Sequence, residues 1–439
     1  MKLLLVSPCQ YENRRFSNSL RIPQISLNII AALTPAHYGI KIVEEELEDV
    51  NFDEDCDIVG ISTMTANAPR AYKIAMEFKK RGKTVVLGGV HPTVLPHESI
   101  QYADAVVIGE AEDTWEILLK DFEQGKLQRF YTSHQPDASL CPLPRRELSS
   151  KTRGLFNVMP VVTTRGCPYD CDFCCVPQFF GKKLRSLPVE KVVEDIIASE
   201  GKKFLFLDDN IIGHPKYAKQ LFKALIPLKI KWVGQASVSF VKDSELMKLA
   251  AESGCIVLFF GLESVSTSAL SKMRKSIKDL TDNEEAIKKV KDYGIVFHAS
   301  MVFGFDEDDK SIFDETLEFL MKNRIATVTF NILTPYPGTR IYNKFKEEGR
   351  LLTEEWHYYD HNTVVFKPKN MSPRELLEGH LYARKNFYSI NSIIRRLSHS
   401  SSHPLLYTAM NIGFRKSIKE DIKNLQNEIT RLEPIYKYL

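Results

Sequence analysis

Residues 161–185 read VVTTRGCPYDCDFCCVPQFFGKKLR. Within them Cys167, Cys171 and Cys174 form a C-x3-C-x2-C array directly after a β-rich run. Three thiolates on one short loop can hold three irons of a cubane cluster and leave the fourth iron open to another ligand. A structural zinc site would need a fourth Cys or His nearby, and Cys175, adjacent to Cys174, is badly placed to supply it. The array therefore predicts an iron–sulfur cluster with an open iron.

Downstream of the array, strand-like and helix-like patterns alternate. Counting the run that begins at Val161, six strand–helix units follow one another, which is fewer than the eight of a closed TIM barrel. Gly254 and Gly294 fall where helices must end before the next strand. The later strand-like runs are KFLFLDDN (203–210), KWVGQASV (231–238), CIVLFFGLES (255–264), IVFHASMVFGF (295–305) and ATVTFNILT (326–334), and the expected helices cover 187–201, 217–228, 243–253, 282–293 and 311–323.

Upstream of the array, five β-rich runs are separated by helical stretches, which is typical of a doubly wound parallel sheet. The runs are MKLLLVSP (1–8), IKIVEEE (40–46), DIVGIST (57–63), TVVLGGV (84–90) and ADAVVIGE (103–110), with helices expected over 25–39, 69–81 and 114–125. We expect Gly39 to end the first of these helices. Ligands of such sheets bind at the carboxyl ends of the strands, where this chain places small and hydroxyl residues. The alternative is that these are only turn residues.

The composition is that of a globular protein with two or three domains. Of 439 residues, 44% are hydrophobic and 26% charged, and 21 Gly with 21 Pro exclude collagen and low-complexity classes. The formal charge of +3 is too small to indicate nucleic acid as a partner. We find no apolar run near the roughly 18 residues that cross a bilayer and no signal-peptide pattern. We therefore expect a cytoplasmic protein without a disulfide framework, in which the four cysteines clustered between Cys167 and Cys175 serve metal or redox chemistry.

The cysteine array and its flanks resemble the radical S-adenosylmethionine (SAM) superfamily. Phe173 lies at the aromatic position before the third cysteine, and Arg165-Gly166-Cys167-Pro168 matches the usual entry to the loop. The resemblance implies a six-unit (β/α)6 partial TIM barrel that binds a [4Fe-4S] cluster through Cys167, Cys171 and Cys174. It also implies an enzyme that cleaves SAM to a 5′-deoxyadenosyl radical, which abstracts hydrogen from a substrate carbon. The electron would come from a donor such as flavodoxin or ferredoxin.

In this superfamily SAM binds at the carboxyl ends of the barrel strands. Asp208-Asp209-Asn210 takes the place of the common Gly-Gly-Glu segment and departs from it, whereas Gly261-Leu262-Glu263-Ser264 resembles the Gly-Ile-Glu-Ser segment of several branches. The SAM contacts that the resemblance implies are Phe173, Asp208, Asp209, Gln235, Ser237, Glu263 and Ser264. For each, the alternative is a packing or capping role. His298, in an apolar strand, is favoured as a core histidine.

An α/β sheet placed before such a barrel resembles the cobalamin-binding class, which includes methyltransferases, the anaerobic magnesium-protoporphyrin cyclase and hopanoid-modifying enzymes. The Asp-x-His-x-x-Gly segment that supplies a lower ligand to cobalt is absent, and residues 44–49 read EEELED. Any bound cobalamin would then lack a histidine ligand from that motif. The cobalamin contacts that the resemblance implies are Ser62, Thr63, Met64, Gly88, Gly89, His91, Gly109 and Glu110. The alternative is a sheet that binds substrate or a partner in a cobalamin-free radical SAM enzyme.

The implied reaction is cobalamin-dependent C-methylation or a related cyclisation or rearrangement of an organic substrate of unknown class. One rival is a radical SAM methylthiotransferase, in which Cys9, Cys56 and Cys141 would bind a second cluster. Another is an iron–sulfur sensor or scaffold without catalysis. A count of clusters per chain separates the cobalamin-dependent enzyme from the methylthiotransferase. One cluster favours the former and two clusters favour the latter.

We expect four segments. Residues 1–135 form the cobalamin-binding-like domain, 136–158 a surface linker, 159–340 the barrel and 341–439 a mostly helical extension. Ser372, Pro373 and Glu375 predict a capped helix start. From Met371 onward the tail has 11 Lys or Arg against 6 Asp or Glu. A basic helical tail is compatible with contact to a membrane surface or lipid substrate; the alternative is a cap packed on the barrel.

Overall fold

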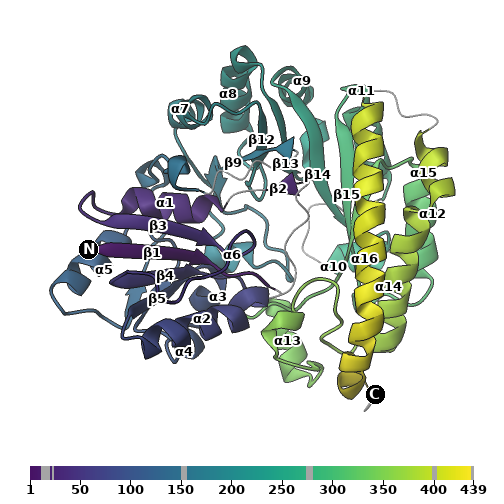
Figure 1. The fold of residues 1–439 in the computed structure, drawn as a ribbon. Coiled ribbons are helices and arrows are strands. Elements are labelled where there is room, and N and C mark those ends of the chain that lie inside the picture. Colours follow the sequence, from purple (N-terminus) through teal and green to yellow (C-terminus); the bar gives the residue numbers. More distant parts are fainter. Residues whose placement is uncertain (11–19, 22–23, 150–155, 273–279, 398–402, 437–439) are drawn as a thin grey trace. The chain divides into compact units, whose positions relative to one another are not determined.

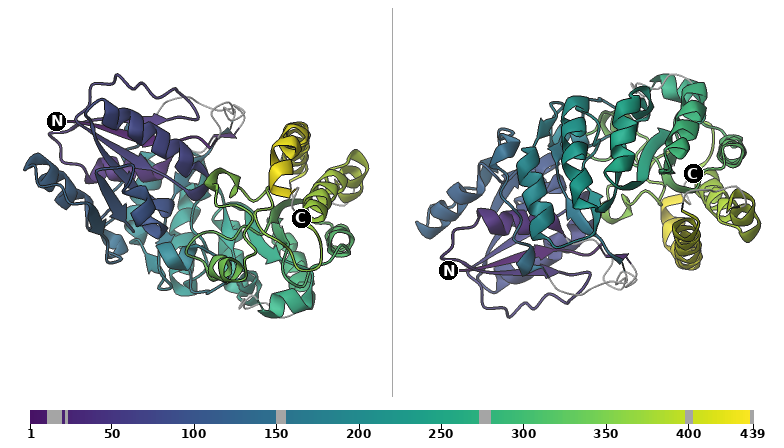
Figure 2. Two further views of the ribbon diagram at one scale, coloured as in Figure 1. Left: turned by 90° about the horizontal axis from the view of Figure 1, so that it is seen from below. Right: turned by 90° about the horizontal axis from the view of Figure 1, so that it is seen from above.

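The computed structural model describes the chain except for residues 11–19, 22–23, 150–155, 273–279, 398–402 and 437–439 (Figures 1 and 2). The chain divides into two compact units. Unit 1 comprises Met1–Pro168 and Cys175–Asp209, and unit 2 comprises Tyr169–Cys174 and Asn210–Leu439. The division therefore falls inside the barrel sequence and within the cysteine loop.

The first sheet is parallel, and its strand order reverses direction next to the first strand. Its order is β3 (Gly39–Glu44), β1 (Lys2–Ser7), β4 (Ile58–Ser62), β5 (Thr84–Gly88), β6 (Ala105–Ile108) and β7 (Phe130–Thr132). Within this sheet β3 lies on one side of β1, and the later strands β4 to β7 lie on the other. The confirmed doubly wound topology puts the switch point, where ligands of such sheets bind, between β1 and β4.

Both faces of this sheet are covered by helices, which explains why its strands are apolar on both sides. Helices α1 (Ile25–Leu33) and α5 (Trp115–Glu123) pack on one face, and α2 (Ala68–Lys80) packs on the other (Figure 1). Short helices α3 (Val90–Val94) and α4 (Pro96–Ser99) follow β5. Each helix buries its apolar stripe against alternate residues of the strands.

The first helix ends six residues before Gly39, which corrects the expected boundary. Thr34 caps it, and its hydroxyl donates to the Ile30 carbonyl at 2.8 Å. Pro35 follows and cannot continue the helical hydrogen bonds. Gly39 instead begins β3.

The second sheet contains the six parallel strands that the sequence predicts. Its order is β16 (Thr327–Ile332), β15 (Val296–Phe303), β14 (Cys255–Glu263), β13 (Lys231–Ala236), β12 (Lys203–Phe206) and β9 (Met159–Val161). The connecting helices include α7 (Val189–Ala198), α8 (Pro215–Leu225), α9 (Ser244–Glu252), α11 (Leu280–Asp292) and α12 (Ile312–Lys322). Gly254 ends α9 at φ 95°, and a Cβ there would lie 2.0 Å from the Ile230 carbonyl oxygen. Only glycine fits this turn.

The segment expected to be a surface linker belongs to unit 1 and is anchored to it around Arg146. Arg146 pairs with Asp195 of α7 at 2.6 Å and donates to the Pro160 carbonyl at 2.7 Å. Asn28 of α1 donates to the Arg145 carbonyl at 2.7 Å. These contacts tie the segment to α1, α7 and β9, and residues 150–155 lie outside the described part.

The C-terminal helices pack on the barrel in unit 2. They are α13 (Arg340–Glu347), α14 (Pro373–Phe387), α15 (Ile390–Leu397) and α16 (Pro404–Tyr436), and α14 has the expected capping box between Ser372 and Glu375. Figure 1 shows α16, in yellow, beside α14. Arg396, 1% exposed, donates to the Ala326 carbonyl at 2.7 Å and to Asn411 at 3.0 Å. Among the described residues no helix has the length and apolar character to cross a membrane.

Candidate cofactor sites

The three cysteines of the array lie on the loop between β10 (Thr164–Arg165) and α6 (Val176–Phe179). Cys167, Cys171 and Cys174 are half-buried, and none of them forms a disulfide. No group of three His, Cys, Asp or Glu side chains is arranged to hold a metal ion in the part of the chain that the structure describes. The cluster assignment therefore depends on the chemistry of the donor set, because three thiols within eight residues suit an open-iron cubane.

The surroundings of Cys175 bear on the choice of ligands. Burial, assisted by the negative charge of Asp209, raises the pKa of the Cys175 thiol. A metal ligand must be a thiolate, so burial disfavours Cys175 as a ligand. This agrees with the ligand set that the spacing predicts.

The entry to the cysteine loop requires glycine. Gly166 has φ 88°, and a Cβ there would lie 2.8 Å from the Lys183 carbonyl oxygen. At the base of the loop, β10 pairs antiparallel with β11 (Arg185–Ser186), with Arg165 opposite Arg185. The Arg-Gly-Cys entry is thus fixed by backbone geometry as well as by the resemblance.

Within unit 2, an arginine that the sequence did not single out holds the middle of the cysteine loop. Arg340, at the start of α13, pairs with Asp172 at 2.6 Å and with Asp170 at 2.8 Å. Phe173 packs its ring edge-on against Phe305, with centroids 6.0 Å apart. Arg340 ends the segment TPYPGTR and is 168 residues from Asp172, so local sequence patterns could not reveal the pair.

Two adjacent carboxyl groups follow β12 and have different surroundings. Asp208 is fully buried, and its Oδ1 accepts hydrogen bonds from the backbone N–H and hydroxyl groups of Thr163 and Thr164. Burial nevertheless raises the pKa of Asp208. Burial, together with the charge of Asp208, raises the pKa of Asp209 to about 7. Asp208 thus holds Thr163 and Thr164, just before the cysteine loop, by hydrogen bonds. Asp209 instead lines a cavity.

Four polar side chains form a hydrogen-bonded group in unit 2. The Ser237 hydroxyl lies 2.8 Å from that of Ser239, which lies 3.1 Å from the Tyr169 hydroxyl. The Ser237 N–H donates to Asn210 Oδ1 at 3.2 Å. Because Tyr169 belongs to the cysteine loop, Ser237 is the expected SAM contact that the structure brings to this loop.

The other expected SAM contacts are placed separately in unit 2. Gln235 is exposed on β13, and Ser264 is buried and accepts from the Ser266 N–H at 3.1 Å. Glu263 ends β14 at φ 66°, a left-handed conformation that non-glycine residues seldom adopt outside special sites. His298 is 1% exposed, with its nitrogens 2.8 Å from the hydroxyls of Thr327 and Thr329. It is a hydrogen-bonded core histidine.

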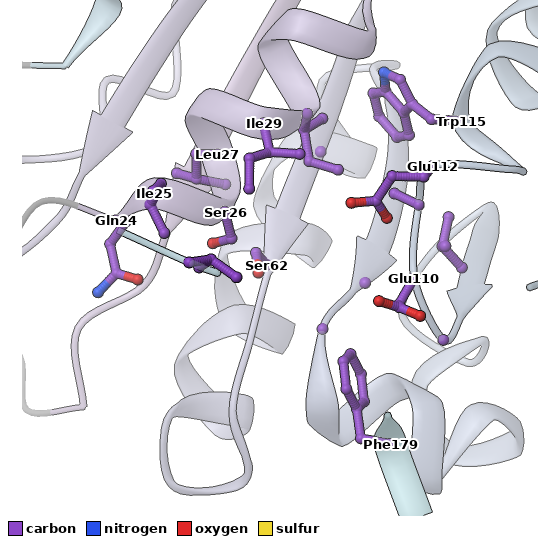
Figure 3. Close-up of a pocket in the computed structure, with 18 of the residues that line it drawn as sticks. Gln24, Ile25, Ser26, Leu27, Ile29, Ser62, Glu110, Glu112, Trp115 and Phe179 are labelled. Atoms are coloured by element: carbon purple, nitrogen blue, oxygen red, sulfur yellow. The ribbon is translucent and has the colours of Figure 1, made fainter. Parts of the chain in front are cut away.

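A cavity of about 530 Å³ opens at the carboxyl ends of the first sheet, and all its lining residues belong to unit 1. Figure 3 shows Glu110 and Glu112 on one side and Ile25, Leu27 and Ile29 of α1 on the other. Five of the eight expected cobalamin contacts line it, namely Ser62, Gly88, Gly89, Gly109 and Glu110. The cavity lies where the topology predicts a ligand.

The remaining three expected cobalamin contacts are not among the lining residues. Thr63 is buried and donates to Asn67, and Met64 is 55% exposed. His91 is fully buried, with Nε2 3.0 Å from the Tyr72 hydroxyl and 3.3 Å from Glu98. His91 therefore faces Tyr72 of α2, on the side of the sheet away from α1.

The shape of the cavity depends on glycine at the end of β5. Gly89 has φ 100°, and a Cβ there would lie 2.6 Å from the Thr63 carbonyl oxygen. The backbone of β5 can therefore approach that of β4, which leaves space above both strands for a large ligand. A broad, mostly apolar hollow with a few polar groups suits a corrin ring.

Several lining residues are not among the expected cobalamin contacts. They come from α1, from the loop after β6 and from both flanks of the cysteine loop: Gln24, Ser26, Glu112, Trp115, Thr164, Arg165, Phe179 and Phe180. The signal that could have found Glu112 is the repeated carboxylate in Gly109-Glu110-Ala111-Glu112. The described lining contains no His, Cys, Met or Tyr.

Comparisons with known proteins match both parts of the chain. The family model "Radical SAM superfamily" matches residues 161–320, and "B12 binding domain" matches residues 19–119. Two methyltransferases of Chlorobaculum tepidum are each 31% identical to the chain. They are bacteriochlorophyllide d C-12(1)-methyltransferase, over 90% of this chain and 89% of the relative, and bacteriochlorophyllide d C-8(2)-methyltransferase, over 93% and 94%.

Solved structures share the fold at lower identity. The radical SAM methyltransferase TsrM from Kitasatospora setae, with cobalamin and a [4Fe-4S] cluster bound, matches with a TM-score of 0.64 at 15% identity and covers 79% of this chain and 78% of that one. The cobalamin-dependent radical enzyme OxsB matches with a TM-score of 0.70 at 17% identity, over 95% and 71%. The chain belongs to the radical SAM superfamily, in its cobalamin-dependent class with an N-terminal B12-binding domain, and is a radical SAM methyltransferase of that class.

Proposed function

We propose that this chain methylates a carbon atom of a chlorophyll-type tetrapyrrole. The observation that carries the proposal is the 31% identity, over about nine-tenths of both chains, to two enzymes named for methylation of bacteriochlorophyllide d. When bound, the cluster and SAM supply a radical that removes hydrogen from the substrate, and cobalamin supplies the methyl group. A small electron-transfer protein such as flavodoxin or ferredoxin provides the electron.

The arrangement of unit 1 supports methyl transfer over a reaction without cobalamin. The cavity at the B12-type strand ends is lined by Thr164 and Arg165, which directly precede the Gly166-Cys167 entry. Phe179 and Phe180, just after the loop, also line it. The residues that flank the cysteine loop therefore also form part of the wall of the cobalamin cavity.

We further propose that the protein holds cobalamin without an imidazole ligand to cobalt. The described lining contains no His, and His91 is engaged with Tyr72 and Glu98 in the core. In the cob(II)alamin form, the electron paramagnetic resonance (EPR) spectrum, including any nitrogen superhyperfine splitting from the cofactor's own base, should be the same in wild type and His91→Gln. Nitrogen splitting that disappears in His91→Gln would contradict this.

The substrate assignment is tested with anaerobically purified, cluster-loaded protein supplied with cobalamin, a low-potential reductant and SAM carrying a deuterated methyl group. Bacteriochlorophyllide d and a hopanoid precursor are offered separately, and products are analysed by mass spectrometry. We expect the tetrapyrrole to gain one labelled methyl group, and the Cys174→Ala variant to form none. Labelled hopanoid instead of tetrapyrrole would overturn the substrate class, and an oxidised tetrapyrrole without label would indicate cyclisation.

A further inference from the structure

Four buried charged side chains in unit 1 form one continuous ion cluster. Arg165 pairs through Nη1 with Glu110 and through Nη2 with Glu112, each at 2.5 Å. Arg185 pairs with the second oxygen of Glu110, also at 2.5 Å. The side chains of all four are at most 11% exposed. Two positive and two negative groups balance, so each is neutralised within the cluster.

The two sides of the cluster come from different parts of the cofactor machinery. Glu110 and Glu112 belong to the loop after β6, at the carboxyl end of the B12-type sheet. Arg165 and Arg185 face each other across the β10–β11 pair at the base of the cysteine loop. Arg165 is two residues before Cys167. The cluster therefore joins the cobalamin cavity to the loop that carries the first iron ligand.

The geometry restricts how the two parts can move. Arg165 uses both ends of its planar guanidinium, one for each carboxylate, which fixes its orientation more strictly than a single ion pair would. Arg185 also donates to the Pro136 carbonyl at 2.7 Å and to the Phe180 carbonyl at 3.1 Å. Glu110, Glu112 and Arg165 themselves line the cavity. A change in the cluster therefore alters both the cavity wall and the base of the loop.

We propose that Glu112, Glu110 and Arg165 are positioning residues that set the placement of the base of the cysteine loop, residues 164–167, against the cobalamin cavity of the same unit. The inference rests on the cobalamin-dependent class and is independent of the substrate. Loss of the Glu112 charge leaves the cluster with one uncompensated buried positive charge, and Arg165 is then held by Glu110 alone.

The test uses two variants and a matched control. Glu112→Gln keeps the shape of the side chain and removes its charge. Arg165→Lys keeps the charge but replaces the planar, two-ended guanidinium by a single ammonium group that does not fix the orientation of the two carboxylates. The control, Asp195→Asn, breaks the buried ion pair with Arg146 in the same unit, outside this cavity. Three quantities are measured on cluster-loaded protein: iron per chain, the dissociation constant of hydroxocobalamin by absorbance titration, and the EPR spectrum of the reduced cluster with SAM.

We expect Glu112→Gln to retain its iron, to bind hydroxocobalamin at least about tenfold more weakly and to show an altered EPR spectrum. Arg165→Lys should show a smaller loss of hydroxocobalamin affinity and a smaller change in the EPR spectrum. Asp195→Asn should match the wild type in both the affinity and the spectrum. Affinity within twofold of wild type and an unchanged spectrum in both variants would overturn the proposal, as would an equal loss in Asp195→Asn. If the wild-type protein binds cobalamin but methylates no tetrapyrrole, only the proposed substrate is overturned. The cobalamin affinity and the EPR spectrum are both measured without substrate, so they test the positioning role separately.

Discussion

Neighbouring residues of identical chemistry take different roles in this chain because strand ends place them in different surroundings. Asp208 is enclosed by Thr163 and Thr164, whereas Asp209 faces the cavity. The sequence places both at a strand end and predicts SAM contacts for both, but it cannot separate them, because the direction of each side chain depends on where β12 ends. The cysteines are more predictable, since their spacing alone restricts which can share one cluster.

At the scale of single residues, two substitutions test which cysteines bind the iron–sulfur cluster. Cys174→Ala should abolish cluster assembly and SAM cleavage, because only two loop thiolates remain. Cys175→Ala should retain both, since burial raises the pKa of the Cys175 thiol and so disfavours the thiolate that a metal ligand requires. Iron analysis and 5′-deoxyadenosine production measure the two effects. The reverse result, with Cys175→Ala losing the cluster and Cys174→Ala keeping it, would show that the ligand assignment is wrong.

A buried carboxyl group after β15 gives a pH dependence of stability. Burial raises the pKa of Asp308 to about 7, although the N–H groups of Gly304 and Phe305 donate to it. Its unfolded pKa is about 3.9. The stability contributed by the neutral group is therefore complete below about pH 4 and is lost as pH rises through about 7.

Asp308→Asn carries a permanently neutral amide and lacks this dependence. The Tm of the variant relative to wild type should therefore rise by several degrees between pH 5 and pH 8, since each pKa unit corresponds to about 1.4 kcal/mol. Thermal scans of both proteins at the two pH values measure the difference. A constant difference in Tm would contradict the raised pKa.

At the scale of elements, the long strands and helices could be predicted because their apolar periodicity is strong. The exceptions have local causes. Pro35 ends α1 early, and the three-residue strand β7 is too short to show a pattern. The segment around Arg146 has loop composition, yet distant partners hold it. Contacts of this kind leave no periodic signal.

The junction of β4 and β5 offers a test of the cobalamin cavity. Gly89→Ala would add a Cβ 2.6 Å from the Thr63 carbonyl oxygen at a positive φ, so β4 and β5 must separate at the cavity floor. We expect cobalamin binding to weaken by at least about tenfold, the equivalent of about 1.4 kcal/mol, with iron content unchanged. Gly82→Ala is the matched control, since Gly82 also has a positive φ but no atom within 4 Å. Equal cobalamin affinity in both variants would contradict the assigned cavity.

At the scale of the whole molecule, the order of the two parts could be predicted, because the motifs stand in sequence order. The ion cluster of Glu110, Glu112, Arg165 and Arg185 could not, because its members are brought together only by folding. The same holds for Arg340 and the two aspartates that flank Cys171. The strand ends that line the cavity could therefore be predicted from the sequence, whereas the ion pairs that position the cysteine loop require the structure.

A cofactor inventory of protein purified without oxygen, from cells supplied with cobalamin, tests the assignment to the cobalamin-dependent class most directly. Iron, sulfide and cobalt are quantified per chain. We predict about four irons, about four sulfides and about one cobalt, as expected for one cubane cluster and one cobalamin. Iron and sulfide without cobalt would contradict a cobalamin-dependent enzyme, and about eight irons would indicate two clusters and the methylthiotransferase alternative.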